Sequence, residues 1–504
     1  MTKRIIDKPY ETSLADTHSV LLNTGGALRQ MRIGVFREQL NKNDQQVLND
    51  LAFGFAVNEH SSLGDARVDT YGNDHMRAIW EGMKELVLMD ANGNYATLNK
   101  NDARYLSDGT KIVDDNGALI SPWNNGDIMV IIPEYYGRIQ SVTVGNETYL
   151  RPWFSPVPLP GGYVIPRQVV GKFKCSIVSN KLRSIPAQVP GNTRTVRAFW
   201  DLAQARSKNH GLSNLDFRNY LLQHMMSKYG YRDSQGCRNS DNTLVWGVGL
   251  DGSENPTSSS SDGLIRQKNI LTGATLSLGL SDGKSVVTDS AGGTCHKVNV
   301  AGFEDPWGQY WEMCGGLCSV GTNVYCWQSN FIPPVSSNPT AATFANIPHV
   351  VLSRPTAENT TNVAMNVIQA AEGQGLYMVP LSTKSGITYN DHYWYAANGQ
   401  LWMFGGHSNY GSNCGLACAN SNNAWSNSNA NISARLTTLI GSLTDKTIRM
   451  SVPRHGKASD DHEPRRQVRM YSLCSRNNIH LARIKVSLSA CDVSKSARKL
   501  NASH

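Results

Sequence analysis

Helical patterning is confined to two short stretches of this 504-residue chain. Residues 193–207 and the segment that Asn214 would cap place large apolar side chains at helical spacing, and we expect these side chains to be buried. Elsewhere short apolar runs alternate with turn residues, the chain holds 44 Gly, and 17% of its residues are charged. Such a chain is typical of β strands joined by many loops. The sequence therefore predicts an α+β, β-rich fold whose loops carry the function.

Turn signals divide the N-terminal third into short elements. A helix is expected between Val35 and Leu51. The sequences Asp90-Ala-Asn-Gly and Asp114-Asp-Asn-Gly lie between apolar runs, and each predicts a β-hairpin. The run that begins Asp127-Ile-Met-Val-Ile-Ile predicts a buried strand.

Positive charge is concentrated at the C-terminal end. The formal net charge is +8, and residues 443–504 hold 13 Lys or Arg against 5 Asp or Glu, so the remainder of the chain is neutral. These residues also lack a sustained period, and we expect them to form a basic, poorly structured tail. A basic patch interleaved with aromatics is missing from residues 1–442, so we predict no nucleic-acid partner.

No export or membrane signal is visible. An apolar run of about 7–15 residues does not follow the basic residues near the start, and a run of about 18 apolar residues occurs nowhere. We therefore expect no signal peptide and no membrane insertion. The ten Cys are then expected to be free thiols, because disulfides form mainly in exported proteins.

Common catalytic and cofactor motifs are missing or lack their structural context. HExxH and the phosphate-binding GxxxxGK[ST] do not occur. The pairs Cys314/Cys318 and Cys414/Cys418 have neither the two-residue spacing nor the paired histidines of a structural zinc site. We predict no catalytic residues, no metal and no cofactor, and a protein that is not an enzyme.

The segment 405–429 differs from the rest of the chain. Of its 25 residues, 17 are Asn, Ser, Gly or Tyr. These four types fill antibody paratopes, where Tyr supplies rigid contact area and the others supply adaptable hydrogen bonds. A flexible surface loop has the same composition, but strand-like sequences at 401–404 and 431–436 would fix both ends of this segment to a core. The two anchors favour a displayed binding loop.

Certain residue types are missing from this region. Between Gly405 and Ala434 there is no Lys, Glu, Gln or Met, and Trp425 is the single Trp. If asparagine codons of the form AAY are mutated at their adenines, none of these five types can arise, whereas His, Ser, Tyr, Cys and Ala can. The pattern is compatible with adenine-directed diversification.

Several segments resemble a known family. The segment 405–436, ending in Ala-Arg-Leu, resembles the variable region of target proteins of diversity-generating retroelements. Upstream, Gly302-Phe-Glu-Asp-Pro-Trp-Gly-Gln-Tyr-Trp-Glu-Met resembles a signature of the C-type lectin fold, which these proteins share with the formylglycine-generating enzyme group. Residues 126–136 and 228–235 are similar to parts of phage tail proteins of this class, and 14–28 is similar to the virion-attaching start of tail fibres.

The resemblance implies a domain organisation and a function. A C-type lectin-like fold, with two helices and twisted antiparallel sheets, is expected over 126–442. A small β-rich domain over 52–125 and a virion-attachment segment over 1–51 would precede it, and the basic tail over 443–504 would follow. The implied protein is a phage or prophage tail adhesin, located in the virion tail, that binds a host-cell surface receptor, either protein or glycan. Other tail proteins are implied partners, as is a homo-oligomer, with the trimer as one candidate.

The resemblance also assigns residue roles by position. Variable, ligand-binding positions, which we expect to face solvent, are His407, Ser408, Asn409, Tyr410, Ser412, Asn413, Cys414, Ala417, Cys418, Asn420, Asn422 and Asn423. Scaffold positions are Gly405, Gly406, Gly411, Gly415, Leu416, Arg435 and Leu436. Tyr410 and His407 are the expected hot spots, because aromatic anchors dominate interface energies. Leu416 is expected to anchor the loop in the core.

Two departures from the family pattern keep alternatives open. The chain continues for 68 residues after Leu436, whereas members of the family commonly stop soon after this motif. The Glu-Pro-Asn and Trp-Asn-Asp motifs of calcium-dependent sugar-binding lectins do not occur, so we predict no calcium site. One alternative is an oxidase of the formylglycine-generating type that uses Cys414 and Cys418. The other is a structural tail component whose Asn-rich loop binds nothing.

Overall fold

The computed structural model describes residues 19–24, 27–32, 44–56, 67–98, 112–113, 119–120, 126–144, 147–247, 249–250, 270–288, 293–327, 333, 337–356, 363–369, 376–383 and 391–438. They belong to one compact unit, Met1–Ile448. The tail predicted over 443–504 lies outside the described residues. In the described ranges, no helix has the length and apolarity needed to cross a membrane.

Both predicted helices are present. α5 (Val196–Arg206) starts after Thr195, whose hydroxyl accepts a first-turn backbone N–H. α6 (Leu215–Tyr229) starts after Asn214, whose side chain also accepts a first-turn N–H, and it ends at Gly230 with φ +67°. These caps satisfy N–H groups that the first turn leaves unbonded, and glycine readily takes the left-handed conformation that ends a helix. The predicted Asn214 cap is therefore confirmed.

Two further α-helices lie among the described residues. α2 (Asp44–Leu51) covers the C-terminal part of the helix expected over 35–51, whose first part lies outside the described residues. α3 (Asp74–Glu81) follows Asn73, whose side chain accepts two backbone N–H groups of its first turn. Short 3-10 helices are η2 (Leu276–Leu278), η3 (Ala341–Phe344) and η4 (Ser408–Asn413).

A six-stranded antiparallel sheet joins distant parts of the chain. In order, its strands are β16 (His210–Leu212), β29 (Leu436–Thr438), β13 (Gln168–Gly171), β9 (Asp127–Ile132), β5 (Glu85–Met89) and β6 (Tyr95–Thr97). β9 is buried along its whole length, as predicted. The turn between β5 and β6 is the predicted Asp90 hairpin, in which the Asp90 carboxylate accepts two backbone N–H groups.

A five-stranded sheet contains the earliest strands of the main body. Its order is β12 (Tyr163–Ile165), β10 (Tyr135–Val144), β11 (Glu147–Ser155), β3 (Phe53–Ala56) and β4 (Asp69–Gly72). Strands from the range predicted as a separate domain, 52–125, thus pair with strands from 126–442 in both sheets. The predicted boundary near residue 125 falls inside shared sheets, because pairing follows the burial of strand faces and not the order of segments in the chain.

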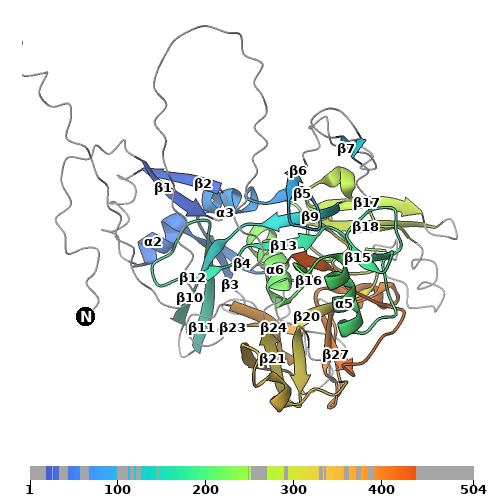
Figure 1. Ribbon diagram of the computed structural model, residues 1–504. Helices are drawn as coiled ribbons and strands as arrows, with labels where there is room; N and C mark the ends of the chain where they lie inside the picture. The colour runs from blue at the N-terminus through green and yellow to red at the C-terminus, as the bar shows by residue number, and fades with distance from the viewer. Residues whose placement is uncertain are drawn as a thin grey trace, which may run out of the picture. The chain divides into compact units, whose positions relative to one another are not determined.

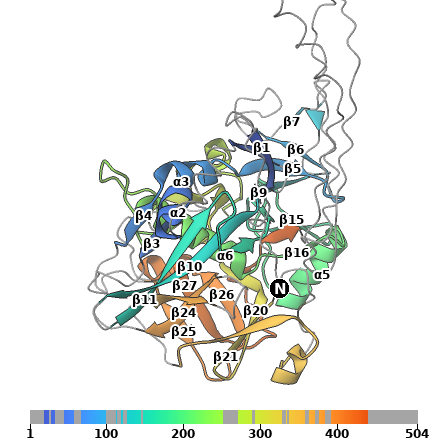
Figure 2. The same ribbon diagram turned by 90° about the vertical axis from the view of Figure 1, so that its left-hand side faces the viewer.

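The seven-stranded sheet carries the Asn-rich segment. Its order is β22 (His349–Ser353), β21 (Asn323–Trp327), β20 (Trp311–Val320), β26 (Leu401–Gly405), β27 (Gly415–Asn423) and β25 (Tyr393–Tyr395), and β28 (Ile432–Ser433) pairs with β20 in parallel. Figure 2 shows β20, β26 and β27 side by side.

Smaller sheets complete the described structure. Their strands are β1 (Ser19–Thr24), β2 (Ala27–Arg32), β7 (Ile112–Val113), β8 (Leu119–Ile120), β14 (Ser176–Val178), β15 (Lys181–Arg183), β17 (Gly283–Thr288), β18 (Thr294–Val300), β19 (Phe303–Glu304), β23 (Val363–Gln369) and β24 (Leu376–Thr383). The antiparallel pair β7–β8 flanks the second predicted hairpin. Figure 1 shows α5 beside β15 and β16. The α+β, β-rich class is confirmed.

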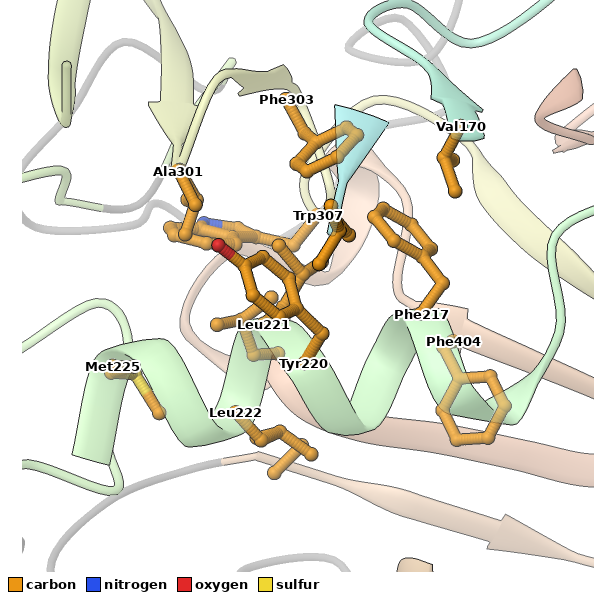
Figure 3. Close-up of a cluster of buried hydrophobic side chains, with 14 of the residues drawn as sticks. Val170, Phe217, Tyr220, Leu221, Leu222, Met225, Ala301, Phe303, Trp307 and Phe404 are labelled. Atoms are coloured by element: carbon orange, nitrogen blue, oxygen red, sulfur yellow. The ribbon is translucent and has the colours of Figure 1, made fainter. Parts of the chain in front are cut away.

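The largest core cluster surrounds α6. Phe303 and Trp307 pack against one side of the helix, and Phe404 from β26 packs near its first turn (Figure 3). Twelve of the fifteen α6 residues are buried, including the polar Arg218 and His224. Both polar side chains have partners, since Arg218 donates to backbone carbonyls and His224 bonds to a carboxylate. Burial of the predicted helix aromatics is confirmed.

Candidate functional site

Nine residues of the Asn-rich segment, Gly415–Asn423, form an interior strand of the seven-stranded sheet. From β26 the chain passes through η4 and returns as β27, which is antiparallel to β26 and parallel to β25. Successive side chains of β27 point to opposite faces of the sheet. Ala417 and Ala419 belong to one hydrophobic cluster, and Cys418 belongs to another. β27 is therefore covered on both faces.

This burial corrects the expectation that the predicted variable side chains face solvent. Six are buried: His407, Ser408, Cys414, Ala417, Cys418 and Asn420. Five are half-buried: Tyr410, Ser412, Asn413, Asn422 and Asn423. Of Asn409 the structure describes the backbone, which lies in η4. The expectation fails because the polar composition suggested a loop, whereas β27 is a strand with both faces covered. The half-buried positions lie in η4 and at the C-terminal end of β27.

The predicted scaffold positions have clear structural roles. Positive φ angles occur at Gly405, Gly406, Gly411 and Gly415. At Gly405, with φ +87°, an added Cβ would lie 2.3 Å from the carbonyl oxygen of Pro306. Conformation and space both require glycine there. Leu416 is buried in the core, and so are Arg435 and Leu436.

Side chains from outside the segment hold its backbone. Gln235 Nε2 donates to the carbonyl oxygen of Gly411 (2.9 Å), and Ser234 Oγ accepts the N–H of Leu416 (3.0 Å). Asp391 Oδ2 accepts the next N–H of β27 (2.9 Å). Ser234 and Gln235 end one of the segments that resemble the family, whereas Asp391 lies in none of the predicted motifs. These bonds fix the backbone without using side chains of the Asn-rich segment.

Five ring-bearing residues form an aromatic cluster beside η4: Trp311, His392, Trp394, His407 and Tyr410. The rings of His392 and Trp394 are stacked, with centroids 3.8 Å apart. Tyr410 continues the row, 4.5 Å from Trp394 and 4.2 Å from His407. Trp311 meets Trp394 edge-on at 5.2 Å. Such contacts add packing energy beyond burial of area. Trp394 and Tyr410 are half-buried, so the cluster reaches the surface.

The sequence identified two members of this cluster and missed three. His407 and Tyr410 were the expected hot spots, although His407 is buried. A signal for His392 and Trp394 exists in the run His392-Tyr-Trp-Tyr, four consecutive ring-bearing residues. Trp311 lies in the segment interpreted as a fold signature. The pairing of β20, β26, β27 and β25 brings these positions together.

Asparagine side chains bond to one another at the C-terminal end of β27. Asn420 Oδ1 accepts the backbone N–H of Asn422 (2.9 Å) and Nδ2 of Asn423 (3.1 Å). Asn423 Nδ2 also donates to Asn422 Oδ1 (2.7 Å), and Asn427 Nδ2 donates to Asn423 Oδ1. Mutual bonding removes the penalty of partly burying amides. The half-buried Asn422 and Asn423 are thus held in place as uncharged donors and acceptors.

The two motifs that resemble the family meet in a buried ion pair. Arg435 Nε lies 3.0 Å from Glu312 Oε2. The Arg435 guanidinium also donates to the backbone carbonyls of Gly171, Lys172 and Glu304. The chain that leaves the Asn-rich segment is therefore fixed to the signature that contains Glu312 and to β13. A guanidinium suits this role because its donors are rigid and always charged.

The described residues offer little for covalent or metal chemistry. Among them, no group of three His, Cys, Asp or Glu is placed to hold a metal ion. All eight described cysteines, including Cys414 and Cys418, are buried and belong to no disulfide. Burial raises the pKa of Cys418 well above its ordinary value, so this thiol stays protonated at neutral pH.

Acid is expected to weaken the fold through His407. Burial lowers the pKa of His407 from 6.5 to about 4, so an unfolded chain takes up the proton at a higher pH than the folded one. This stability contribution is complete above pH 6.5 and is lost as the pH falls towards 4, by about 3 kcal/mol in total. In urea titrations, the stability advantage of the wild type over His407→Gln should shrink by this amount between pH 7 and pH 4. An advantage that stays constant with pH would contradict the assignment.

No protein-family model matches the chain, and no curated protein matches it by sequence.

Proposed function

We propose that the protein is a phage or prophage tail adhesin that binds a host-cell surface receptor through the face made by η4, β25 and the end of β27. The fixed frame around the Asn-rich segment carries this proposal. Ser234, Gln235 and Asp391 hold its backbone, and the Arg435–Glu312 pair holds its exit. A binding face on a rigid frame can change its side chains while its backbone stays in place.

We propose further that residues 126–442 have a C-type lectin-like fold and that a diversity-generating retroelement varies the segment. Two helices beside antiparallel sheets support the fold assignment. The bond between the signature residue Glu312 and Arg435 of the Ala-Arg-Leu motif supports it as well. Such an adhesin would act in the virion tail, as a homo-oligomer attached to other tail proteins.

The half-buried residues form the proposed contact face: Tyr410, Ser412, Asn413, Asn422 and Asn423. The buried predicted positions would instead shape the face from below. Cys418 and Asn420, for example, lie under it with less than a tenth of their surface exposed. Substitutions at buried positions are limited by volume and by unsatisfied polar groups, whereas half-buried positions tolerate more types.

The oxidase alternative gains no support from the cysteines. Thiol chemistry needs a reachable thiolate. Cys414 and Cys418 are buried, and the pKa of Cys418 is raised. Mutation of both to Ser should leave receptor binding largely intact, whereas an enzyme of that type would lose turnover.

Deep sequencing of the gene in a population grown from one clone tests diversification. We expect substitutions at adenines of codons 407–423, with the widest range at codons 410, 412, 413, 422 and 423. At Cys418 we expect small residues alone, because its side chain is fully buried. Codons 391–404 serve as the internal control. A variable segment as invariant as that control would contradict diversification and would favour a structural tail component.

A further inference from the structure

Among the described residues that form the binding face, no charged side chain is free to meet a ligand. Across residues 391–434, all of which the structure describes, Asp391 is the single Asp, Glu, Lys or Arg. It is 1% exposed and already accepts a backbone N–H. A charged ligand would lose its hydration here without gaining a partner of opposite sign. The face therefore disfavours charged ligands.

Three buried arginines that contact β27 or the chain after it already have partners. Arg354, under β25 and β27, donates to the carbonyl oxygens of Gly321, Ser421, Ala396 and Ala397. Arg218 and Arg435 likewise donate to backbone carbonyls in the core. None of these guanidinium groups is presented to the surface, since Arg354 is 4% exposed and the other two are less so.

Apolar ring surface and uncharged amides lie together on this face. Trp394 pairs with Asn420 in the parallel β25–β27 ladder, and the Asn420 side chain bonds directly to Asn422 and Asn423. Tyr410 is next to Trp394 at 4.5 Å. On the other flank, the backbone N–H of His392 donates to the carbonyl oxygen of Asn413 (3.2 Å). Half-exposed rings are thus flanked by half-exposed amides.

We infer that the ligand of this face is a neutral glycan of the host surface, bound without metal and with Trp394 as a fixed specificity-determining residue. A sugar ring offers an apolar C–H patch beside hydroxyls that donate and accept, which matches rings flanked by amides. A protein receptor would need about 800 Å² of surface from this partner and would gain from rim charges, and the face offers few half-buried residues and no free charge. The inference rests on the proposed adhesin function.

The aromatic cluster also makes the face rigid before binding. His392 stacks on Trp394, and Trp311 supports Trp394 from below. A ligand that meets prearranged side chains loses less freedom on binding, which raises affinity for small epitopes. Trp394 lies outside the segment 405–436, so diversification would leave it constant while Tyr410, Asn413 and Asn422 change around it. Changes at the variable positions would then alter which glycan binds, while the Trp394 contact stays the same.

Binding of the full-length protein to cells of its host separates this inference from the proposed function. Mild periodate, which cleaves vicinal diols, should lower cell binding at least about tenfold, and protease treatment should change it less than about twofold. In purified envelope glycan, the fraction that an anion exchanger does not retain should compete for binding. Protease-sensitive, periodate-resistant binding would overturn the glycan inference and leave an adhesin. No binding to untreated host cells would instead overturn the adhesin function.

Two variants of Trp394 and one control variant test its role. Trp394→Ala should weaken cell binding at least about tenfold. Tyr395→Ala is the matched control, since Tyr395 is also half-buried but points to the opposite face, over Arg354. It should bind within about twofold of the wild type. Trp394→Phe, which keeps a ring, should bind between the two and serves if the alanine variant fails to fold. Wild-type affinity in a folded Trp394 variant would overturn the assignment.

Discussion

Replacing Glu312 by Ala is expected to lower the free energy of unfolding by about 3–5 kcal/mol, because it leaves a buried Arg435 without its carboxylate. Burial alone would raise the pKa of Glu312, but Arg435, Lys174 and Arg218 outweigh that effect and lower it. The carboxylate is thus ionised in the folded protein and balances several buried cations. Urea unfolding of the variant at pH 7 measures the loss.

The control for this prediction is an exposed ion pair. Arg197 and Asp201 are 2.9 Å apart on the surface of α5 and largely in solvent. Asp201→Ala should therefore cost less than about 1 kcal/mol. Glu312→Gln, which keeps the shape but removes the charge, should fall between the two. A loss below about 1 kcal/mol for Glu312→Ala would show that the remaining carbonyl bonds suffice to hold Arg435.

Replacing Gly415 by Ala should destabilise the protein by a similar amount. The residue has φ +149°, and an added Cβ would lie 1.8 Å from Oδ1 of Asp391. The carboxylate cannot simply move aside, since its other oxygen accepts the N–H of Ala417. Backbone strain of about 1–3 kcal/mol and overpacking of about 1–3 kcal/mol together predict a loss on the order of 4 kcal/mol. Thermal unfolding of the variant measures this loss.

Gly321→Ala separates the two causes. Gly321 also has positive φ, +62°, but nothing lies within 4 Å of its Cβ position. It should lose about 1–2 kcal/mol from conformation alone. The excess at Gly415 then reports the clash, and it should shrink when Asp391 is also replaced by Ala. Equal losses at the two glycines would contradict a clash with Asp391.

Local signals in the sequence predicted local structure well. Asn214 marks the start of α6, and the run from Asp127 forms a buried strand, because caps and apolar runs act through neighbouring residues. The predicted scaffold glycines mark the tight path around η4 for the same reason. These features depend on backbone geometry within a few residues.

The packing of segments that are far apart in the chain could not be predicted from local sequence patterns. The composition of β27 suggested an exposed loop, and nothing local reveals that β25 and β26 flank it or that both of its faces are covered. Trp311 and Trp394 likewise lie in the candidate site only because the strand order β20, β26, β27, β25 brings distant parts of the chain together. Asp391 acquires its role from the backbone of β27 alone, which no residue pattern encodes.

The position of β29 has a consequence for synthesis of the chain. This strand, Leu436–Thr438, is inserted between β16 and β13 in a sheet whose other members lie within residues 85–212. On the ribosome, the first half of the chain must therefore wait with an open gap in its sheet until more than two hundred further residues have emerged. Pairings across such distances are slow, and unpaired strand edges invite aggregation meanwhile. A product that stops before residue 436 would keep that gap permanently, so chains released early should be cleared or aggregate instead of competing for assembly.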